Sequence, residues 1–127
     1  MNKIKNYNEW LMQADYDLAT AKAMLDTGRY IYSVFMIHLS IEKALKALFA
    51  KKINENPIRT HNLNYLVEAI NIELPEEFKE FIEDLNNKSV PTRYPESLQT
   101  ILKYYKKRET TKMYNKAKKL IKWLKKN

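Results

Sequence analysis

The stretch YIYSVFMIHLSIEKALKALFAKK, residues Tyr30–Lys52, decides the fold of this chain. It contains no Gly and no Pro, and its apolar residues cover more than one face of a helix. A helix of this kind must be surrounded by other helices or by a second copy of the chain. His38 and Ser40 interrupt the apolar run. We therefore expect this helix to form the core, to contribute to a dimer interface and to supply part of any site.

Five further segments carry apolar residues at spacings of three and four, which is the period of an amphipathic helix. They are residues 7–26, about 60–70, 75–85, about 96–105 and about 110–126. Asn6 or Asn8 is expected to cap the first segment, and Thr60 or Asn62 the second. Pro75 stands at the start of the third, where proline suits the first helical turn. Residues 86–95, with prolines at 91 and 95, are expected to form a polar loop.

The 127 residues include one glycine, Gly28, and show no alternating strand pattern and no internal repeat. A chain of this length buries roughly two-thirds of its unfolded surface without a disulfide or a structural metal. Short connections place successive helices antiparallel to one another. The sequence therefore predicts a single all-α domain over residues 1–127, an up-and-down antiparallel bundle of four to five helices.

Composition excludes several classes of protein. The absence of cysteine rules out a disulfide framework, cysteine zinc sites and thiol catalysis. His38 and His61, the only histidines, lack the paired spacing of a zinc-binding helix, and one glycine cannot build a phosphate-binding loop. We expect no metal and no cofactor. With no signal-peptide pattern and no apolar run of about 20 residues, we expect a cytoplasmic protein that does not enter a membrane.

Positive charge is concentrated near the C-terminus. Of the 23 Lys and Arg residues, 11 lie between Lys103 and Lys126, a segment with one acidic residue, Glu109. The remainder of the chain carries 12 basic and 14 acidic residues. Such a basic helix attracts nucleic acid, an acidic protein surface or anionic lipid, and it also occurs as a solvated face without a partner. The sequence leaves these alternatives open.

Four short motifs follow one another along the chain. They are GRY at residues 28–30, EKALKAL at 42–48, THNL at 60–63 and RYP at 93–95, after an opening segment that contains Trp10, Ala14 and Asp15. This ordered set resembles the HEPN family of small prokaryotic helical domains over nearly the whole chain. The resemblance implies a helical bundle that forms two-fold homodimers. It also implies a nucleotide- or RNA-associated protein that partners a minimal nucleotidyltransferase in a toxin–antitoxin-like module.

Some members of that family are metal-independent ribonucleases, which carry an Arg followed by a His four to six residues later. Arg29 precedes His38 by nine positions and Arg59 precedes His61 by two, so this spacing is absent. Whether the chain is an enzyme therefore stays open, and the missing motif favours a binding protein. The alternatives are a metal-independent endoribonuclease toxin and a non-catalytic helical scaffold.

The residues expected to bind a nucleotide or its phosphate are Arg59, His61, Arg93 and Tyr94. His61 falls in the first turn of a predicted helix, where free N–H groups bind anions. Arg93 and Tyr94 lie before Pro95, which restrains Tyr94 to an extended conformation. An arginine held in this way can grip a phosphate in bidentate fashion while the tyrosine stacks on a base.

Each candidate also has a structural interpretation. Arg93 could clamp its loop to the bundle through Asp15 or Asp17. His61 could hydrogen-bond a neighbouring element. His38 lies on the apolar stripe of the Tyr30–Lys52 helix, where it is either a hydrogen-bonded core residue, with Glu42 as acceptor, or a group that lines a catalytic groove. His61 and His38 are therefore the two candidate catalytic residues.

Overall fold

The computed structural model describes residues 5–127, which form six helices and no strand. The helices are α1 (Tyr7–Asp26), α2 (Tyr30–Ile53), α3 (Leu63–Ile70), α4 (Glu76–Arg93), α5 (Leu98–Tyr104) and α6 (Lys107–Lys125). The all-α prediction is confirmed, whereas the predicted count of four to five helices is wrong. Residues 1–4 of the predicted domain lie outside the described residues.

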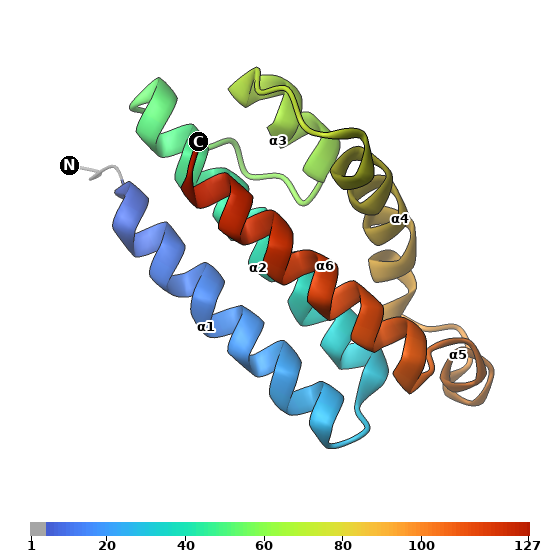
Figure 1. Ribbon diagram of the computed structural model, residues 1–127. Helices are drawn as coiled ribbons and strands as arrows, with labels where there is room; N and C mark the ends of the chain where they lie inside the picture. The colour runs from blue at the N-terminus through green and yellow to red at the C-terminus, as the bar shows by residue number, and fades with distance from the viewer. Residues whose placement is uncertain (1–4) are drawn as a thin grey trace.

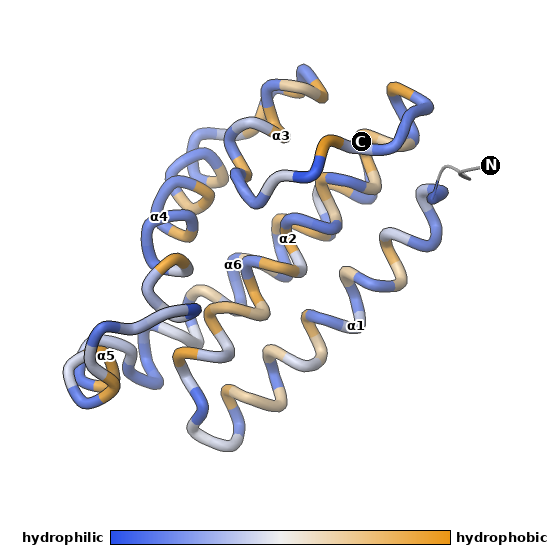
Figure 2. Tube along the Cα trace, turned by 180° about the vertical axis from the view of Figure 1, so that it is seen from behind, coloured by the Kyte–Doolittle hydropathy of each residue, from blue (hydrophilic) through white to orange (hydrophobic). Residues whose placement is uncertain are grey.

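Helix α2 is the centre of the bundle. Figure 1 shows α1, α2, α4 and α6 running alternately down and up, with α3 and α5 at opposite ends of α4. Helix α2 contacts each of the other five helices, and 15 of its 24 residues are buried. In Figure 2 the hydrophobic stretches of α1 and α2 face the interior of the bundle. The apolar faces of α2 are thus covered within one chain and do not by themselves require a second copy.

Helices α1 and α2 pack closely because small residues line their contact. Ala14 and Ala21 are fully buried, and each presents its backbone carbonyl to a serine of α2. The hydroxyl of Ser40 donates to the Ala14 carbonyl at 2.7 Å, and that of Ser33 donates to the Ala21 carbonyl at 2.8 Å. The polar interruption that the sequence shows at Ser40 therefore serves helix packing and not a site.

The prediction of a polar loop at residues 86–95 is wrong, because α4 continues through Pro91 to Arg93. Proline lacks an N–H and usually ends a helix. Here Ser89 and Thr92 are buried, and the Thr92 hydroxyl donates to the Ser89 carbonyl at 2.5 Å. The Tyr105 hydroxyl also donates to the Lys88 carbonyl at 2.6 Å. The burial of Ser89 and Thr92 and the hydrogen bond from Tyr105 hold the last turns of α4 against the bundle.

The helix starts show which caps the sequence identified correctly. Asn6 caps α1 by accepting from Glu9 N at 2.8 Å, and Asn62 caps α3 by accepting from Tyr65 N at 3.3 Å. Helix α6 begins at Lys107, before the start near Thr110 expected from the sequence. Thr110 is buried inside the first turn, where its hydroxyl donates to the Lys106 carbonyl. No helix within residues 5–127 is both long enough and apolar enough to cross a membrane.

Candidate functional site

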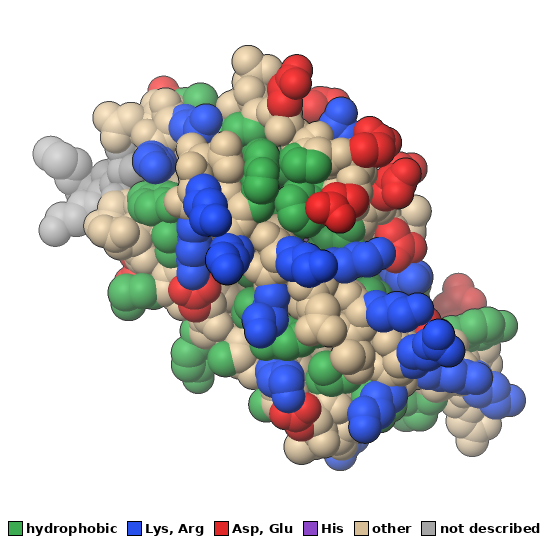
Figure 3. Space-filling view, in the orientation of Figure 1, with side chains coloured by type: hydrophobic (Ala, Val, Ile, Leu, Met, Phe, Trp, Pro, Cys, Tyr) green, Lys and Arg blue, Asp and Glu red, His purple; other side chains and the backbone are tan. Residues whose placement is uncertain are grey.

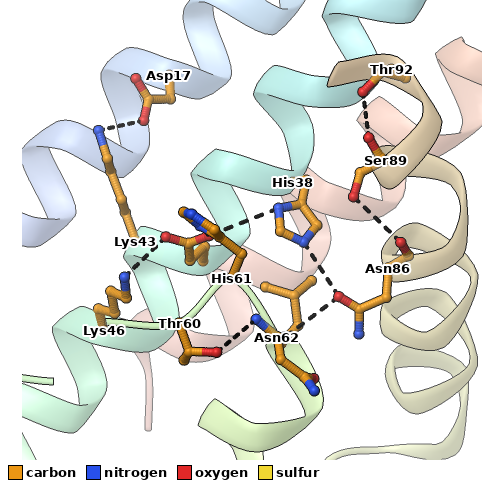
Figure 4. A network of polar contacts seen from close by, with 12 residues as sticks. Asp17, His38, Lys43, Lys46, Thr60, His61, Asn62, Asn86, Ser89 and Thr92 are labelled. Carbon is orange, nitrogen blue, oxygen red and sulfur yellow. Dashed lines mark hydrogen bonds and ion pairs between the residues drawn. The ribbon is translucent and has the colours of Figure 1, made fainter. Parts of the chain in front are cut away.

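A buried carboxylate on α2 organises the polar centre of the molecule. Glu42 is 3 % exposed. Its Oε2 accepts from Lys46 Nζ at 3.0 Å, and its Oε1 accepts from His61 Nδ1 at 2.8 Å (Figure 4). A carboxylate that binds one ring nitrogen of histidine sets which nitrogen carries the proton and how the ring is oriented. His61, whose side chain remains 66 % exposed, therefore keeps Nε2 free to face a ligand.

His38 lies deeper, next to the same carboxylate. Its Nε2 donates to Asn86 Oδ1 at 3.3 Å, while its Nδ1 is 3.9 Å from Glu42 Oε1 and has no hydrogen-bond partner. The predicted hydrogen bond between His38 and Glu42 is therefore wrong, because His61 occupies that oxygen. Burial lowers the pKa of His38 below its ordinary value of 6.5, and the contacts with Asn86 and Glu42 only partly oppose this shift.

Asn86 connects three helices at the base of the site. Its Oδ1 accepts from His38 and also from the backbone N–H of Leu63, the first residue of α3, at 3.4 Å. It reaches these groups only because α4 continues past Leu85 as a helix. The segment that the sequence analysis assigned to a loop thus forms one wall of the site.

Arg93 ends α4 and lies against α2. The centre of its guanidinium group is 5.0 Å from the centroid of the Phe35 ring, and its Nε is buried without a hydrogen-bond partner. The alternative clamp to Asp15 or Asp17 does not form. Asp15 accepts from Lys125 at 3.0 Å, and Asp17 lies 2.9 Å from Lys43 Nζ. Arg93 is therefore held by the aromatic ring and retains unpaired donors.

Two pockets adjoin at His61 and Arg93, which line both. One, of about 440 Å³, has four asparagines in its wall and is lined by His38, His61, Asn62, Asn64, Asn86, Asn87, Ser89, Val90 and Arg93. The other, of about 460 Å³, is mainly aromatic and lined by Tyr32, Phe35, Leu39, His61, Thr92, Arg93 and Tyr94. A polar and an aromatic compartment therefore lie on either side of one imidazole and one guanidinium.

Four of the five residues named from the sequence converge here: His38, His61, Arg93 and Tyr94 each line at least one of the two pockets. Arg59 is exposed in the connection before α3 and lines neither. Their roles as ligand-binding residues stay predictions. Four asparagines and Phe35 also line the pockets and were not identified as site residues from the sequence. A carboxylate in the middle of an apolar helix, Glu42, was the available signal for a polar centre.

The arrangement suits an anionic ligand. Lys46 neutralises Glu42, so a phosphate that approached His61 and Arg93 would meet two donors rather than a bare carboxylate. Within residues 5–127 no group of three or more His, Cys, Asp or Glu side chains is placed to hold a metal ion. The side chains that line the two pockets therefore supply hydrogen-bond donors, one cation and aromatic surface.

Comparison with known proteins agrees with this architecture. The HEPN domain family model matches residues 7–127. The crystal structure of TT1696 from Thermus thermophilus superimposes with a TM-score of 0.83 at 24% identity, covering 94% of this chain and 96% of that one. ST0689, described as an archaeal HEPN homologue, gives a TM-score of 0.77 at 25% identity, covering 96% and 97%. No curated protein matches the chain.

Proposed function

Because this chain belongs to the HEPN domain family, we propose that it is a nucleotide- or RNA-associated member that binds phosphate between His61 and Arg93. The observation that carries this proposal is that these two residues line both adjoining pockets. A nucleotide has an anionic part and an aromatic part, and the two compartments offer a surface for each.

The phosphate would be gripped by groups that the protein leaves unpaired. The guanidinium of Arg93 lies over the Phe35 ring, a contact that restrains it without using its N–H donors. Glu42 orients the imidazole of His61 by accepting from its Nδ1, which leaves Nε2 for the ligand. Donors held in this way lose little conformational freedom when they bind an anion.

The base would occupy the aromatic pocket, where Tyr32, Phe35 and Leu39 come from α2 and Tyr94 follows α4. Tyr94 is 90% exposed, so its ring is free to pack on a planar ligand. Base stacking on an aromatic side chain contributes about 1–3 kcal/mol. The amides that line the other pocket would hydrogen-bond the sugar or further phosphates.

The proposed cellular role is that of a homodimer that partners a minimal nucleotidyltransferase in a toxin–antitoxin-like module. Membership of the HEPN family supports this role. Exposed apolar side chains where α5 meets the start of α2, namely Tyr32, Leu98 and Leu102, offer a surface for the second copy. Co-purification with the product of an adjacent gene that carries a nucleotidyltransferase signature would test the partnership.

Calorimetry with ATP tests the pocket. The unchanged protein should release heat on binding, and Arg93→Ala should weaken binding at least tenfold, since a charge-assisted bidentate contact contributes about 1.5–3 kcal/mol. Arg108→Ala, which removes an exposed arginine of α6, is the charge-matched control and should leave affinity unchanged. Equal weakening by both variants, or no ATP heat from the unchanged protein, would refute the phosphate site.

A metal-independent ribonuclease is the second candidate, favoured by one observation. His38 and His61 both approach Glu42 Oε1 and both line the pocket that contains Arg93. Two imidazoles near one cation could serve as the acid, the base and the phosphate contact of RNA cleavage. In that case expression should slow growth and His61→Ala should relieve it. Failure of the purified protein to cleave any RNA would eliminate this function.

A further inference from the structure

Many Lys and Arg side chains lie on the side of the molecule shown in Figure 3, where the C-terminal helix is exposed. Nine cationic side chains between residues 107 and 126 are all exposed. They are Lys107, Arg108, Lys112, Lys116, Lys118, Lys119, Lys122, Lys125 and Lys126. Acidic side chains gather elsewhere on this face, towards one edge (Figure 3). The excess positive charge found in the sequence therefore forms one patch on the folded protein.

The outermost of these cations form a straight stripe. Arg108, Lys112, Lys119, Lys122 and Lys126 follow each other at helical spacings of four, seven, three and four, with the neutral Asn115 filling the longer interval. At a rise of 1.5 Å per residue the stripe is about 27 Å long. The opposite side of α6 is buried in the core, so its orientation is fixed. The helix backbone therefore holds these five cationic side chains in one row.

Few of these cations are neutralised by the protein itself. Within the described residues, the α6 cation with an ion-pair partner is Lys125, which binds Asp15 at 3.0 Å. Lys118 lies over the ring of Tyr114 at 5.8 Å. An exposed row of unpaired cations holds a layer of counterions, and an anionic polymer gains affinity by releasing them. The row is therefore suited to a polyanion.

The end of the stripe indicates which polyanion. Tyr104 ends α5 just before α6 begins, is 75% exposed, and lines a pocket of about 630 Å³ together with Tyr94, Tyr105 and Pro95. Exposed aromatic rings beside a basic track are the combination that binds single-stranded nucleic acid, in which unpaired bases stack while phosphates follow the charge. Single-stranded RNA offers unpaired bases that stack on such rings, which a polyanion without bases does not.

We propose that the basic stripe of α6, together with Tyr104, is a binding surface for single-stranded RNA. The surface is separate from the proposed nucleotide pocket, since no histidine is visible on this face of the molecule (Figure 3). It contains none of the residues that line the two pockets at His61 and Arg93. An experiment that disproves RNA binding by α6 therefore leaves ATP binding at Arg93 untouched, and the reverse also holds.

Fluorescence anisotropy with a labelled oligouridylate of about 20 nucleotides tests the stripe. If all five cations contact phosphates, the logarithm of affinity should fall with the logarithm of salt concentration with a slope of about −3.5. The triple variant Lys112→Gln/Lys119→Gln/Lys122→Gln should reduce the magnitude of that slope by about 2. It should leave ATP binding at the pocket unchanged.

The control variant removes the same charge from other helices. Lys22→Gln/Lys52→Gln/Lys79→Gln alters exposed lysines of α1, α2 and α4 and should keep the slope of the unchanged protein. Equal effects of the two triple variants would mean that binding is diffuse and would overturn the proposal. So would the absence of RNA binding at low salt, or preferential binding to anionic vesicles or to an acidic polypeptide.

Tyr104→Ala separates RNA from other polyanions. Loss of a stacked base should weaken oligouridylate binding at least about fivefold but leave heparin binding unchanged, because heparin has charge and no bases. Tyr16→Ala is the matched control, since Tyr16 on α1 is also 75% exposed and should affect neither ligand. An equal loss for RNA and heparin, or no loss for either, would overturn the role of Tyr104 and with it the assignment to RNA.

Discussion

At the scale of single residues, the polar centre depends on how Glu42 distributes its two oxygens. Lys46 donates to Oε2 and His61 donates to Oε1, so His38 has a hydrogen bond to Asn86 alone. A buried ion pair that loses one partner costs about 3–5 kcal/mol, so substitution of Glu42 would destabilise the fold as well as the site. Substitutions of the histidines therefore test the site more selectively than substitution of Glu42 does.

The buried histidine makes stability depend on pH. Since burial lowers the pKa of His38, the unfolded chain binds a proton there at a higher pH than the folded chain does. His38 therefore stabilises the fold fully above pH 6.5, and its contribution should decline as pH falls below that value. The slope is at most about 1.4 kcal/mol per pH unit for one proton.

Urea unfolding at several pH values between about 5 and 7.5 measures this effect. His38→Gln keeps a donor for Asn86 but cannot titrate, so its free energy of unfolding should change less with pH than that of the unchanged protein. Titration by NMR should also place the pKa of His38 below 6.5. Identical pH slopes for the two proteins would contradict this account.

Ser40 reports on the contact between α1 and α2. Ser40→Ala removes the donor to the Ala14 carbonyl and should lower the free energy of unfolding by about 1 kcal/mol. Ser40→Val should lower it by a further 1–3 kcal/mol or so, because added methyl groups force closely packed helices apart. Chemical denaturation measures both. A valine variant as stable as the alanine variant would mean that the contact between α1 and α2 accommodates the larger side chain.

At the scale of helices, single side chains cap the starts of α1, α3 and α5, whereas packing decides where α4 ends. Asn6 and Asn62 cap their helices as their residue type predicts. Helix α4 passes through Pro91 against local preference because Ser89, Thr92 and the neighbouring Tyr105 anchor it to the bundle. Local rules therefore predicted starts better than they predicted where α4 ends.

The cap of α1 can be tested by comparing Asn6 with Asn8, the other capping residue considered from the sequence. Asn6 accepts from the Glu9 N–H, whereas Asn8 is exposed within the first turn of α1. Asn6→Ala should therefore lower the free energy of unfolding by about 1 kcal/mol, a typical cost for a lost cap. Asn8→Ala should change it by less than about 0.5 kcal/mol, as expected for an exposed position. A larger loss for Asn8→Ala in urea denaturation would reverse the assignment.

At the scale of the whole molecule, one chain already surrounds α2 with the other five helices. Coverage by other helices is one of the two arrangements expected from the sequence, so the proposed homodimer depends on side chains that stay exposed in the single chain. Tyr32, Leu98 and Leu102 are each 50–56% exposed and line a single pocket of about 430 Å³ at the turn between α1 and α2.

Light scattering at micromolar concentration should show a dimer. Leu98→Asp/Leu102→Asp should convert it to a monomer, because charges buried at an apolar interface without partners oppose association. Met12→Asp, which alters an exposed apolar residue of α1, should leave the dimer intact. A monomeric unchanged protein would rule out the homodimer, and equal effects of the two variants would place its interface elsewhere.

Much of the candidate site was predictable because its residue types were unusual for their positions. His38, His61, Arg93 and Tyr94 were identified from histidines in or beside helices and from an arginine near a proline. Arg59 was selected for its nearness to His61 in sequence, yet it lines neither pocket. The asparagines that wall the polar pocket come from α4 and from the start of α3, and no local pattern relates these two segments.

The sequence alone determined that the chain is helical, where most helices begin, which helix is central and to which family the chain belongs. These features follow from apolar periodicity, capping residues and ordered motifs, all of which act within one or two helical turns. Only the tertiary structure decided that α4 continues past Pro91, that His61 rather than His38 binds Glu42, and that Arg93 and His61 line the same two pockets. Those outcomes depend on contacts between residues far apart in the sequence, such as His61 with Glu42, 19 positions away, and His38 with Asn86, 48 positions away. In such contacts the free energy of packing outweighs local preference.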